Sequence, residues 1–86
     1  MPTLSIFYGI VIKMYWDDHP PPRFHAKYGE FEAQISIDTL EIINGKLPHG
    51  ATVLVREWGM VRRIELLEDW KLCEQLKTPK PIAPLE

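Results

Sequence analysis

Apolar and polar residues alternate along the first part of the chain. From residue 5 to residue 16 every second residue is apolar or aromatic, beginning with Ile6 and ending with Trp16. A period of two places alternate side chains on one face of an extended strand. The alternation therefore predicts a long strand at about 5–16. We expect it to end at Asp17 and the prolines that follow, because proline cannot donate a hydrogen bond to a sheet.

Two further alternating segments, at 23–28 and 30–37, follow the prolines. In the first segment one face is apolar and the other is basic, the basic face being made by Arg23, His25 and Lys27. In the second segment one face is apolar and the other is acidic or polar. Both segments have the pattern of half-buried strands.

A hairpin that turns at Tyr28–Gly29 would join these two strands. In that register His25 lies opposite Glu32, and Ala26 lies opposite Phe31. Apolar residues then face apolar residues and basic residues face acidic ones, which is how cross-strand pairs stabilise a sheet. A slip of one residue would break both matches, so the pattern favours this register.

The second half of the chain changes to a helical pattern. A short strand at about 39–43 is expected to stop at the turn signal Asn44–Gly45. The segment at about 49–77 then has apolar residues at steps of four and three, and no proline interrupts it. The predicted apolar stripe consists of Leu54, Trp58, Val61, Ile64, Leu67, Trp70 and Cys73. An apolar stripe with a step of three residues drifts around a straight helix, which has about 3.6 residues per turn. We therefore expect one long or bent helix. The alternative is two helices that meet near Arg63.

These elements predict an α+β fold. An antiparallel sheet of three to four strands, at about 5–16, 23–28, 30–37 and 39–43, packs against one long or bent helix at about 49–77. A single domain covers residues 1–77, and residues 78–86 form a proline-rich extended tail. Trp58, Trp70 and Cys73 are expected in the core, because they lie on the apolar stripe.

Composition narrows the class of protein. The 86 residues suit one small domain, and an apolar fraction of 45% suits a packed core. A formal net charge of −2 gives the chain no overall attraction for nucleic acid, so phosphate contacts would need a local basic patch. The single cysteine allows no internal disulfide, and no signal peptide or membrane-spanning run is visible. We expect a cytoplasmic protein that does not bind membranes.

The stretch from Asp17 to His25 concentrates the reactive residue types. Asp18, His19 and His25 are potential metal ligands, but three prolines separate the two histidines and the tight ligand pairs typical of zinc sites are missing. We therefore predict no metal and no cofactor. In the simplest alternative, Asp17 and Asp18 are solvated turn residues.

His25 is the best candidate for acid/base chemistry. It lies between two cations on the basic strand face, where Arg23 and Lys27 would bind a phosphate next to a ribose hydroxyl. Arg62 on the helix is a third candidate for phosphate binding, and His19 and Glu32 are supporting residues. The alternative is an ordinary surface hairpin whose opposite charges pair across the strands.

Several motifs resemble a family of small bacterial proteins, the domain-of-unknown-function family 4160. The resemblance covers about residues 1–70. It rests on Asp18-His19-Pro20-Pro21-Pro22, Phe24-His25-Ala26, Tyr28-Gly29-Glu30, Gly45-Lys46-Leu47-Pro48 and Glu57-Trp58. It implies a type II toxin–antitoxin module in which this chain is the toxin and a small protein of family 2442 is encoded beside it.

The chain departs from that family at two positions. Arg23 and Arg62 stand where the family usually has histidine. Arginine can neither coordinate a metal nor give up its proton, but it binds anions well. The substitutions therefore disfavour a metal site shared by the family and favour an anion-binding one.

Three functions follow as hypotheses. The first is a toxin-like component that acts on RNA as a metal-independent ribonuclease and has a small antitoxin-like partner protein. The second is a non-catalytic protein-interaction module that uses a strand edge or the proline-rich tail. The third is a nucleic-acid-binding regulator. A homodimer is compatible with each of them.

Overall fold

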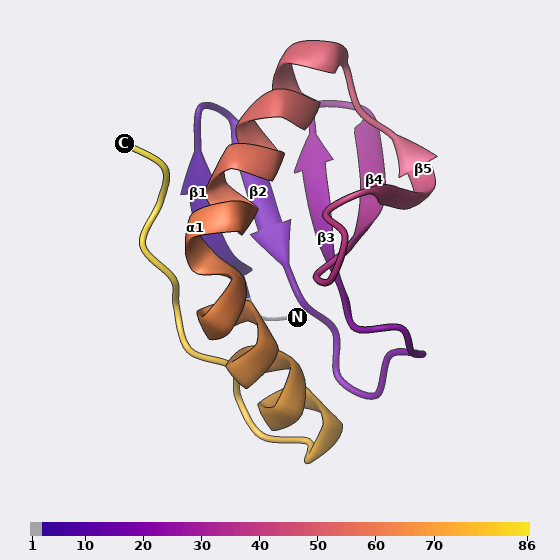
Figure 1. Ribbon diagram of the computed structural model, residues 1–86, viewed down its shortest axis with the longest axis vertical. Helices are drawn as coiled ribbons and strands as arrows, with labels where there is room; N and C mark the ends of the chain where they lie inside the picture. The colour runs from indigo at the N-terminus through magenta and orange to yellow at the C-terminus, as the bar shows by residue number, and fades with distance from the viewer. Residues whose placement is uncertain (1–2) are drawn as a thin grey trace.

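The computed structural model describes residues 3–86 as an antiparallel sheet with one long helix across one of its faces (Figure 1). The five strands follow one another in the order β1-β2-β3-β4-β5, each paired with its neighbour. This confirms the predicted α+β class, although the sheet has five strands instead of three to four. The elements are β1 Thr3–Phe7, β2 Ile10–Lys13, β3 Arg23–Tyr28, β4 Phe31–Ser36, β5 Ile42–Lys46 and α1 His49–Glu74.

The predicted long strand at 5–16 is wrong, because the chain turns back at Tyr8 and Gly9. Both residues have positive φ, at 49° and 78°. Two positive φ values define the type I′ turn that closes two-residue hairpins. The turn changes the phase of the alternation, so Phe7 is buried while Ile6 is 61% exposed.

The second hairpin is present, but its register differs from the prediction by two residues. Tyr28 pairs with Phe31 around the loop Gly29–Glu30, and His25 pairs with Gln34 rather than Glu32. A shift of two leaves every side chain on its predicted face, because the side-chain period of a strand is two. The apolar and basic faces of β3 are therefore confirmed although the partners are not.

The predicted strand at 39–43 is also displaced. Residues 37–41 form the connection, and β5 includes Asn44 and Gly45, which were expected to be a turn. Gly45 has φ of 78°, and a Cβ there would overlap the backbone oxygen of Glu32. The glycine therefore serves close strand pairing rather than chain reversal.

The helix is single and bent, as expected, and it ends at Glu74 instead of near 77. The bend lies at Arg62, whose φ of −106° and ψ of 16° are not helical. The predicted stripe is wrong in its middle, where Val61 and Ile64 are 71% and 75% exposed. The buried residues of α1 are Ala51, Val55, Trp58, Gly59, Leu66, Asp69, Trp70 and Cys73.

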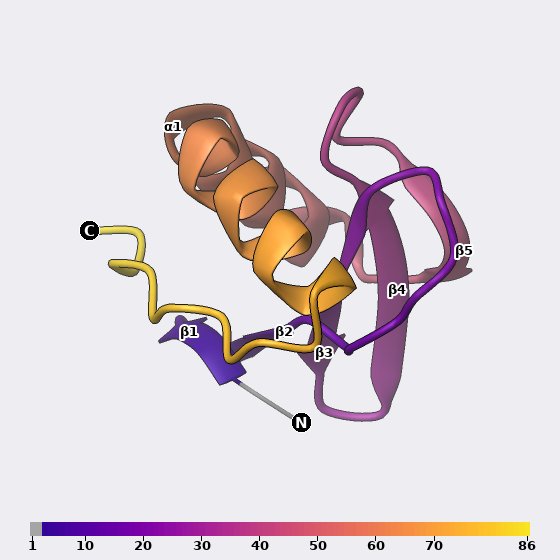
Figure 2. The same cartoon turned by 90° about the horizontal axis from the view of Figure 1, so that it is seen from below.

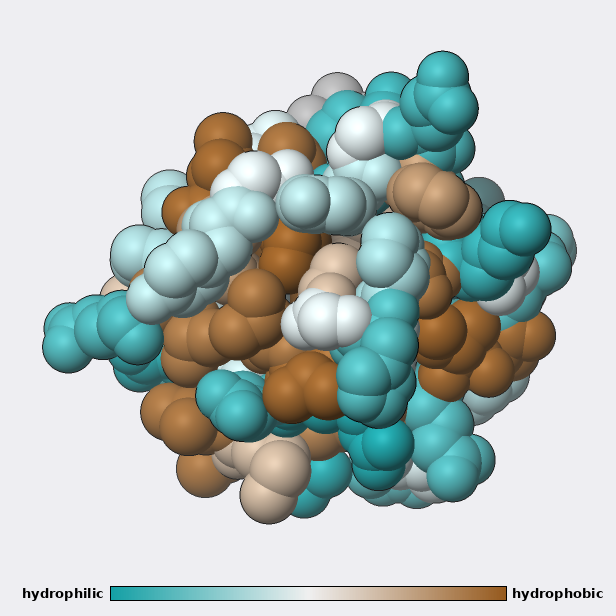
Figure 3. All heavy atoms as spheres, turned by 90° about the horizontal axis from the view of Figure 1, so that it is seen from above, coloured by the Kyte–Doolittle hydropathy of each residue, from teal (hydrophilic) through white to brown (hydrophobic). Residues whose placement is uncertain are grey.

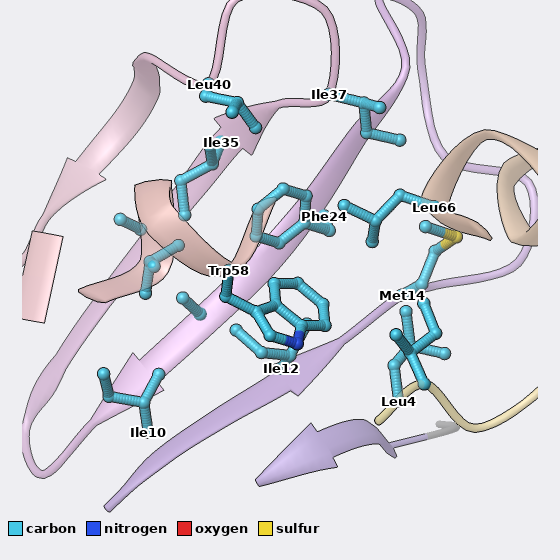
Figure 4. Packing of buried hydrophobic residues seen from close by; sticks show 14 of the residues in the cluster. Leu4, Ile10, Ile12, Met14, Phe24, Ile35, Ile37, Leu40, Trp58 and Leu66 are labelled. Atoms are coloured by element: carbon cyan, nitrogen blue, oxygen red, sulfur yellow. The ribbon is translucent and has the colours of Figure 1, made fainter. Parts of the chain in front are cut away.

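The core lies between α1 and the inner face of the sheet (Figure 4). Trp58 is its centre, with its ring centroid 5.4 Å from that of Phe7 and 5.8 Å from that of Phe24. Gly59 brings α1 close to Leu40, because a Cβ at that position would meet the Leu40 side chain at 2.7 Å. The prediction that Trp58, Trp70 and Cys73 belong to the core is confirmed.

The tail after α1 has no helix or strand, and it runs back beside α1 toward β1 (Figures 1 and 2). The Ile82 backbone N–H donates to the Leu4 carbonyl at 2.8 Å, and the Trp58 indole N–H donates to the Ala83 carbonyl at 2.8 Å. Ile82 is only 4% exposed. The tail is thus part of the packed structure.

Apolar residues also reach the surface. Seen from the end of the molecule where α1 begins, they form contiguous patches between polar ones (Figure 3). Over residues 3–86, no helix combines the length and the apolar character needed to cross a membrane.

Candidate functional site

The candidate site lies on the outer face of the sheet, which α1 leaves uncovered. Alternation along the strands places Lys13, His25 and Lys27 on this face, and Lys13 is the cross-strand partner of His25. The connector at 14–22 loops out on the side of the sheet away from α1 (Figure 2). The peptide bond between Pro20 and Pro21 in this connector is cis.

His25 is the centre of the site. It is only 9% exposed although it lies on the outer face, because the Tyr15 ring packs against its imidazole in a T-shaped arrangement at a centroid distance of 4.2 Å. Its Nε2 is 3.1 Å from Oδ2 of Asp18, and its Nδ1 is 3.6 Å from Oε2 of Glu32. Nδ1 is buried without a hydrogen-bond partner. Each ring nitrogen thus faces a carboxylate, but only one is bonded.

Asp18 fixes the orientation of the imidazole. Burial acts to raise the pKa of Asp18, but hydrogen bonds from the His25 side chain and the His19 backbone N–H, with the charges of His25 and Arg23, lower it below its ordinary value. An ionised carboxylate can only accept hydrogen bonds, so Nε2 of His25 must carry the hydrogen. In the neutral imidazole, Nδ1 is then the nitrogen that can accept a proton.

Tyr15 closes the site from the connector side. Burial raises the pKa of Tyr15, and the negative charges of Glu32 and Asp18 raise it further. The hydroxyl therefore stays protonated, and Tyr15 adds no charge beside the imidazole.

Two shallow hollows meet at His25. One, of about 120 Å³, is lined by Val11, Lys13, Tyr15, His25, Lys27 and Glu32. The other, of about 240 Å³, is lined by Tyr15, Trp16, Asp17, Asp18, His19 and His25. Both are smaller than the roughly 300–1,000 Å³ of pockets that enclose a drug-sized molecule. The dimensions suit a small group rather than an enclosed drug-sized molecule.

Arg23 is near the site, but its guanidinium is already occupied. It donates to Oε1 of Gln34 at 2.7 Å and to the carbonyls of Pro20 and Pro21 at 3.3 Å. Arg23 therefore ties the proline connector to β4. Its predicted contact with phosphate would have to compete with these bonds.

Arg62 is not brought to this cluster. It lies on α1, on the other side of the sheet, and donates to Glu65 at 3.2 Å. The exposed His19 borders the larger hollow and gives its backbone N–H to Asp18 at 2.8 Å. Of the three predicted phosphate-binding residues, Lys27 is the one that lines the hollow beside His25.

Sequence reasoning did not identify Tyr15 or Lys13 as site residues. Lys13 and Tyr15 alternate with the apolar Ile12 and Met14, so they share one face of the predicted strand. This pattern was a usable signal. Only the pairing of β2 with β3 shows that this face also carries His25. Glu32 was predicted as the partner of His25 and lies near it diagonally, while its cross-strand partners are Lys27 on β3 and Lys46 on β5.

The site offers little to a metal ion. Among residues 3–86, no three or more His, Cys, Asp or Glu side chains are grouped as metal binding requires. Asp18 and His25, two of the residues considered as ligands, are instead joined to each other by one hydrogen bond.

Comparison with known proteins identifies a family without naming a function. The model of the family described as "Domain of unknown function (DUF4160)" matches residues 9–71. This range includes every residue of the cluster around His25. No curated protein and no solved structure matches the chain.

Proposed function

The chain belongs to the DUF4160 family, and we propose that it cleaves RNA as a metal-independent ribonuclease, the toxin-like component of a bacterial two-gene module. One observation carries the catalytic part of this proposal: a nearly buried histidine lies between two carboxylates and beside two lysines. The two-gene module and a small antitoxin-like partner rest on the family resemblance.

The proposed reaction uses Nδ1 of His25. This nitrogen takes the proton from a ribose 2′-hydroxyl, and the 2′ oxygen forms a bond to the adjacent phosphorus. The bond from phosphorus to the 5′ oxygen breaks, and this oxygen takes up the proton from the imidazolium. The products are a 2′,3′-cyclic phosphate and a 5′-hydroxyl end, and His25 returns to its initial state.

The neighbouring charges fit this sequence of steps. Asp18 and Glu32 lie 3.1 and 3.6 Å from the two ring nitrogens, and their charge is opposite to the one that the imidazole carries after it takes the proton. Lys13 and Lys27 line the same hollow and would neutralise the charge that grows on the phosphate oxygens. Nδ1 is buried without a partner in this conformation, so substrate reaches it when the half-exposed Glu32 side chain, 3.6 Å away, moves aside.

The test is cleavage of single-stranded RNA by purified wild-type protein and by His25→Gln. Glutamine can still donate to Asp18, so the variant removes proton transfer and keeps the local hydrogen bond. We expect a loss of about 100-fold or more, with cyclic phosphate as the wild-type product and no effect of a chelator. His49→Gln is the matched control, because His49 is exposed at the start of α1.

Two results would overturn the catalytic proposal. Equal cleavage by wild type and His25→Gln would remove His25 from the mechanism, and absence of cleavage by the wild type would remove the reaction. Expression in bacteria gives a parallel readout, since the toxin assignment requires growth arrest that His25→Gln relieves and His49→Gln does not.

A protein-interaction module without catalysis is the second candidate. The edge strand β5 and the exposed apolar residues of α1 favour it. The tail suits it less well, because Ile82 and Pro79 are buried against the domain.

A nucleic-acid-binding regulator would instead show salt-dependent RNA binding without cleavage, and this binding would be weakened in Lys27→Ala.

A further inference from the structure

The side of α1 that faces away from the sheet carries an exposed apolar cluster. Met60, Val61, Ile64 and Leu67 lie within about two turns of the helix and are 68%, 71%, 75% and 39% exposed. A helix that packs on a sheet normally presents polar residues on its solvent side. A contiguous exposed apolar cluster indicates a surface that another molecule covers.

Opposite charges flank this apolar cluster. Glu57 lies seven residues before Ile64, and Lys71 lies seven residues after it. Seven residues are nearly two full helical turns. The bend at Arg62 keeps this phase, since Val55 before it and Leu66 after it, about three turns apart, are both buried against the sheet. Both charges therefore recur on the side of α1 where Ile64 lies. Both side chains are exposed, and neither forms an ion pair within the part of the chain that the structure describes.

We propose that this face of α1 binds the same face of α1 in a second copy of the chain, with the two helices antiparallel. A two-fold axis beside Ile64 brings the two apolar clusters together, as in any isologous interface. It also sets Glu57 against the partner's Lys71, and Lys71 against the partner's Glu57. The joint apolar centre of the interface is then bordered by an ion pair at each of its two ends.

The charge pattern selects the antiparallel arrangement over the parallel one. A parallel pair would set Glu57 against Glu57 and Lys71 against Lys71, and like charges facing each other are destabilising. It also distinguishes a second copy from a lipid surface. Helices that lie on membranes have polar faces rich in lysine and arginine, whereas this face is bordered by two acidic residues, Glu57 and Glu68, and one basic residue, Lys71.

The dimer would leave the proposed ribonuclease site open. His25 and its neighbours lie on the outer face of the sheet, and α1 covers the inner face. The inference therefore does not depend on the proposed function. Loss of the dimer and loss of cleavage can be observed separately.

The test is sedimentation equilibrium of the full chain over a wide concentration range. We expect a monomer–dimer equilibrium in the wild type, and a monomer in Ile64→Glu, because the substitution brings two carboxylates together on the two-fold axis. Ile6→Glu is the matched control, since Ile6 is 61% exposed and lies on β1. It should dimerise like the wild type.

Charge reversal tests the orientation. Glu57→Lys alone and Lys71→Glu alone should each weaken the dimer by about tenfold or more, and the double variant should recover the wild-type affinity. Failure of the double variant to recover would overturn the antiparallel arrangement. A wild type that remains monomeric at every concentration would overturn the proposal, and the face would then belong to a different protein.

Discussion

The two faces of β3 are buried in different ways. Phe24 and His25 are consecutive residues, and they are 0% and 9% exposed. Phe24 is covered by α1 through apolar contacts, which need no hydrogen-bond partner. His25 is covered by a proline-containing connector and depends on Asp18, while its Nδ1 has no partner. Burial of a polar atom without a partner is unfavourable, so Nδ1 of His25 lowers the stability of the fold, and packing on the outer face does not explain why it is retained.

The largest expected effect is on the inner face. Phe24→Ala should lower the free energy of unfolding by about 3–5 kcal/mol, because it removes a fully buried ring and leaves a cavity against Trp58. In a small domain this is a large part of the total stability. Urea unfolding followed by Trp fluorescence measures the loss.

The control for this prediction is Ile6→Thr. Ile6 is 61% exposed, so a β-branched polar replacement should change stability by no more than about 0.5 kcal/mol. If Phe24→Ala and Ile6→Thr had similar effects, the inner face would not be the source of stability.

The sequence was sufficient for the inner face of β3 and β4, because apolar alternation reports burial there. Phe24, Ala26 and Ile35 were placed correctly from period two alone. The first hairpin was missed because Tyr8 is an unusual residue for positive φ, and Gly9 by itself is a weak turn signal. One missed turn then reversed the expected exposure of Ile6.

The outer face could be predicted only in part. Which side chains share the face of His25 follows from alternation, and this was correct for Arg23 and Lys27. The contact between His25 and Asp18 depends on the path of the connector at 14–22, which no periodicity describes. The exposure of Val61 was misjudged for a related reason, since the bend at Arg62 and the close approach at Gly59 set the phase of α1.

Asp18→Asn, on the outer face, should lower the free energy of unfolding by less than Phe24→Ala does on the inner face. Asp18→Asn keeps the shape of the side chain and removes the charge that holds Nε2 of His25. We expect a loss of about 1–2 kcal/mol in the free energy of unfolding, because asparagine can still accept the bond from Nε2 but without the charge that strengthens it. Under the proposed function, RNA cleavage should fall much more than stability does.

Asp17→Asn is the control for this change. Asp17 is adjacent and exposed, and its positive φ of 58° is one that asparagine also adopts readily. Its stability and cleavage should match those of the wild type. If Asp17→Asn were as damaging as Asp18→Asn, the effect would belong to the connector as a whole and not to the contact with His25.

The stabilisation from Asp18 should also depend on pH. Its pKa in the folded protein is lowered, because the hydrogen bonds from His25 and His19 outweigh the effect of burial. The folded chain therefore binds fewer protons than the unfolded one just below the ordinary value of about 3.9. The contribution is complete above that value and is lost as the pH falls through the folded pKa. The melting temperatures of wild type and Asp18→Asn should converge in acid, and a constant difference at all pH values would contradict this.

The smallest expected effect is the pH dependence of stability that comes from Asp69, on the packed side of the molecule. Its sign is opposite to that of Asp18. Asp69 is 2% exposed, its Oδ1 accepts the Lys80 backbone N–H at 2.8 Å, and its Oδ2 has no partner. Burial raises the pKa of Asp69, the Lys80 N–H opposes this, and the charges of Glu65 and Glu68 raise the pKa further. The ionised form is thus disfavoured in the folded chain. Its ionisation should reduce stability as the pH rises from about 3.9 through the folded pKa.

Asp69→Asn isolates this contribution, because asparagine can still accept the Lys80 N–H through its carbonyl oxygen. The melting temperature of the variant, relative to wild type, should be higher at neutral pH than in acid, whereas for Asp18→Asn it should be lower at neutral pH. Parallel curves for wild type and Asp69→Asn would show that Asp69 ionises without strain beneath the tail. Opposite slopes would mean that the outer face of the sheet is arranged to hold a charged carboxylate and the packed side is not. A catalytic site that keeps an ionised carboxylate beside its histidine requires the first of these environments.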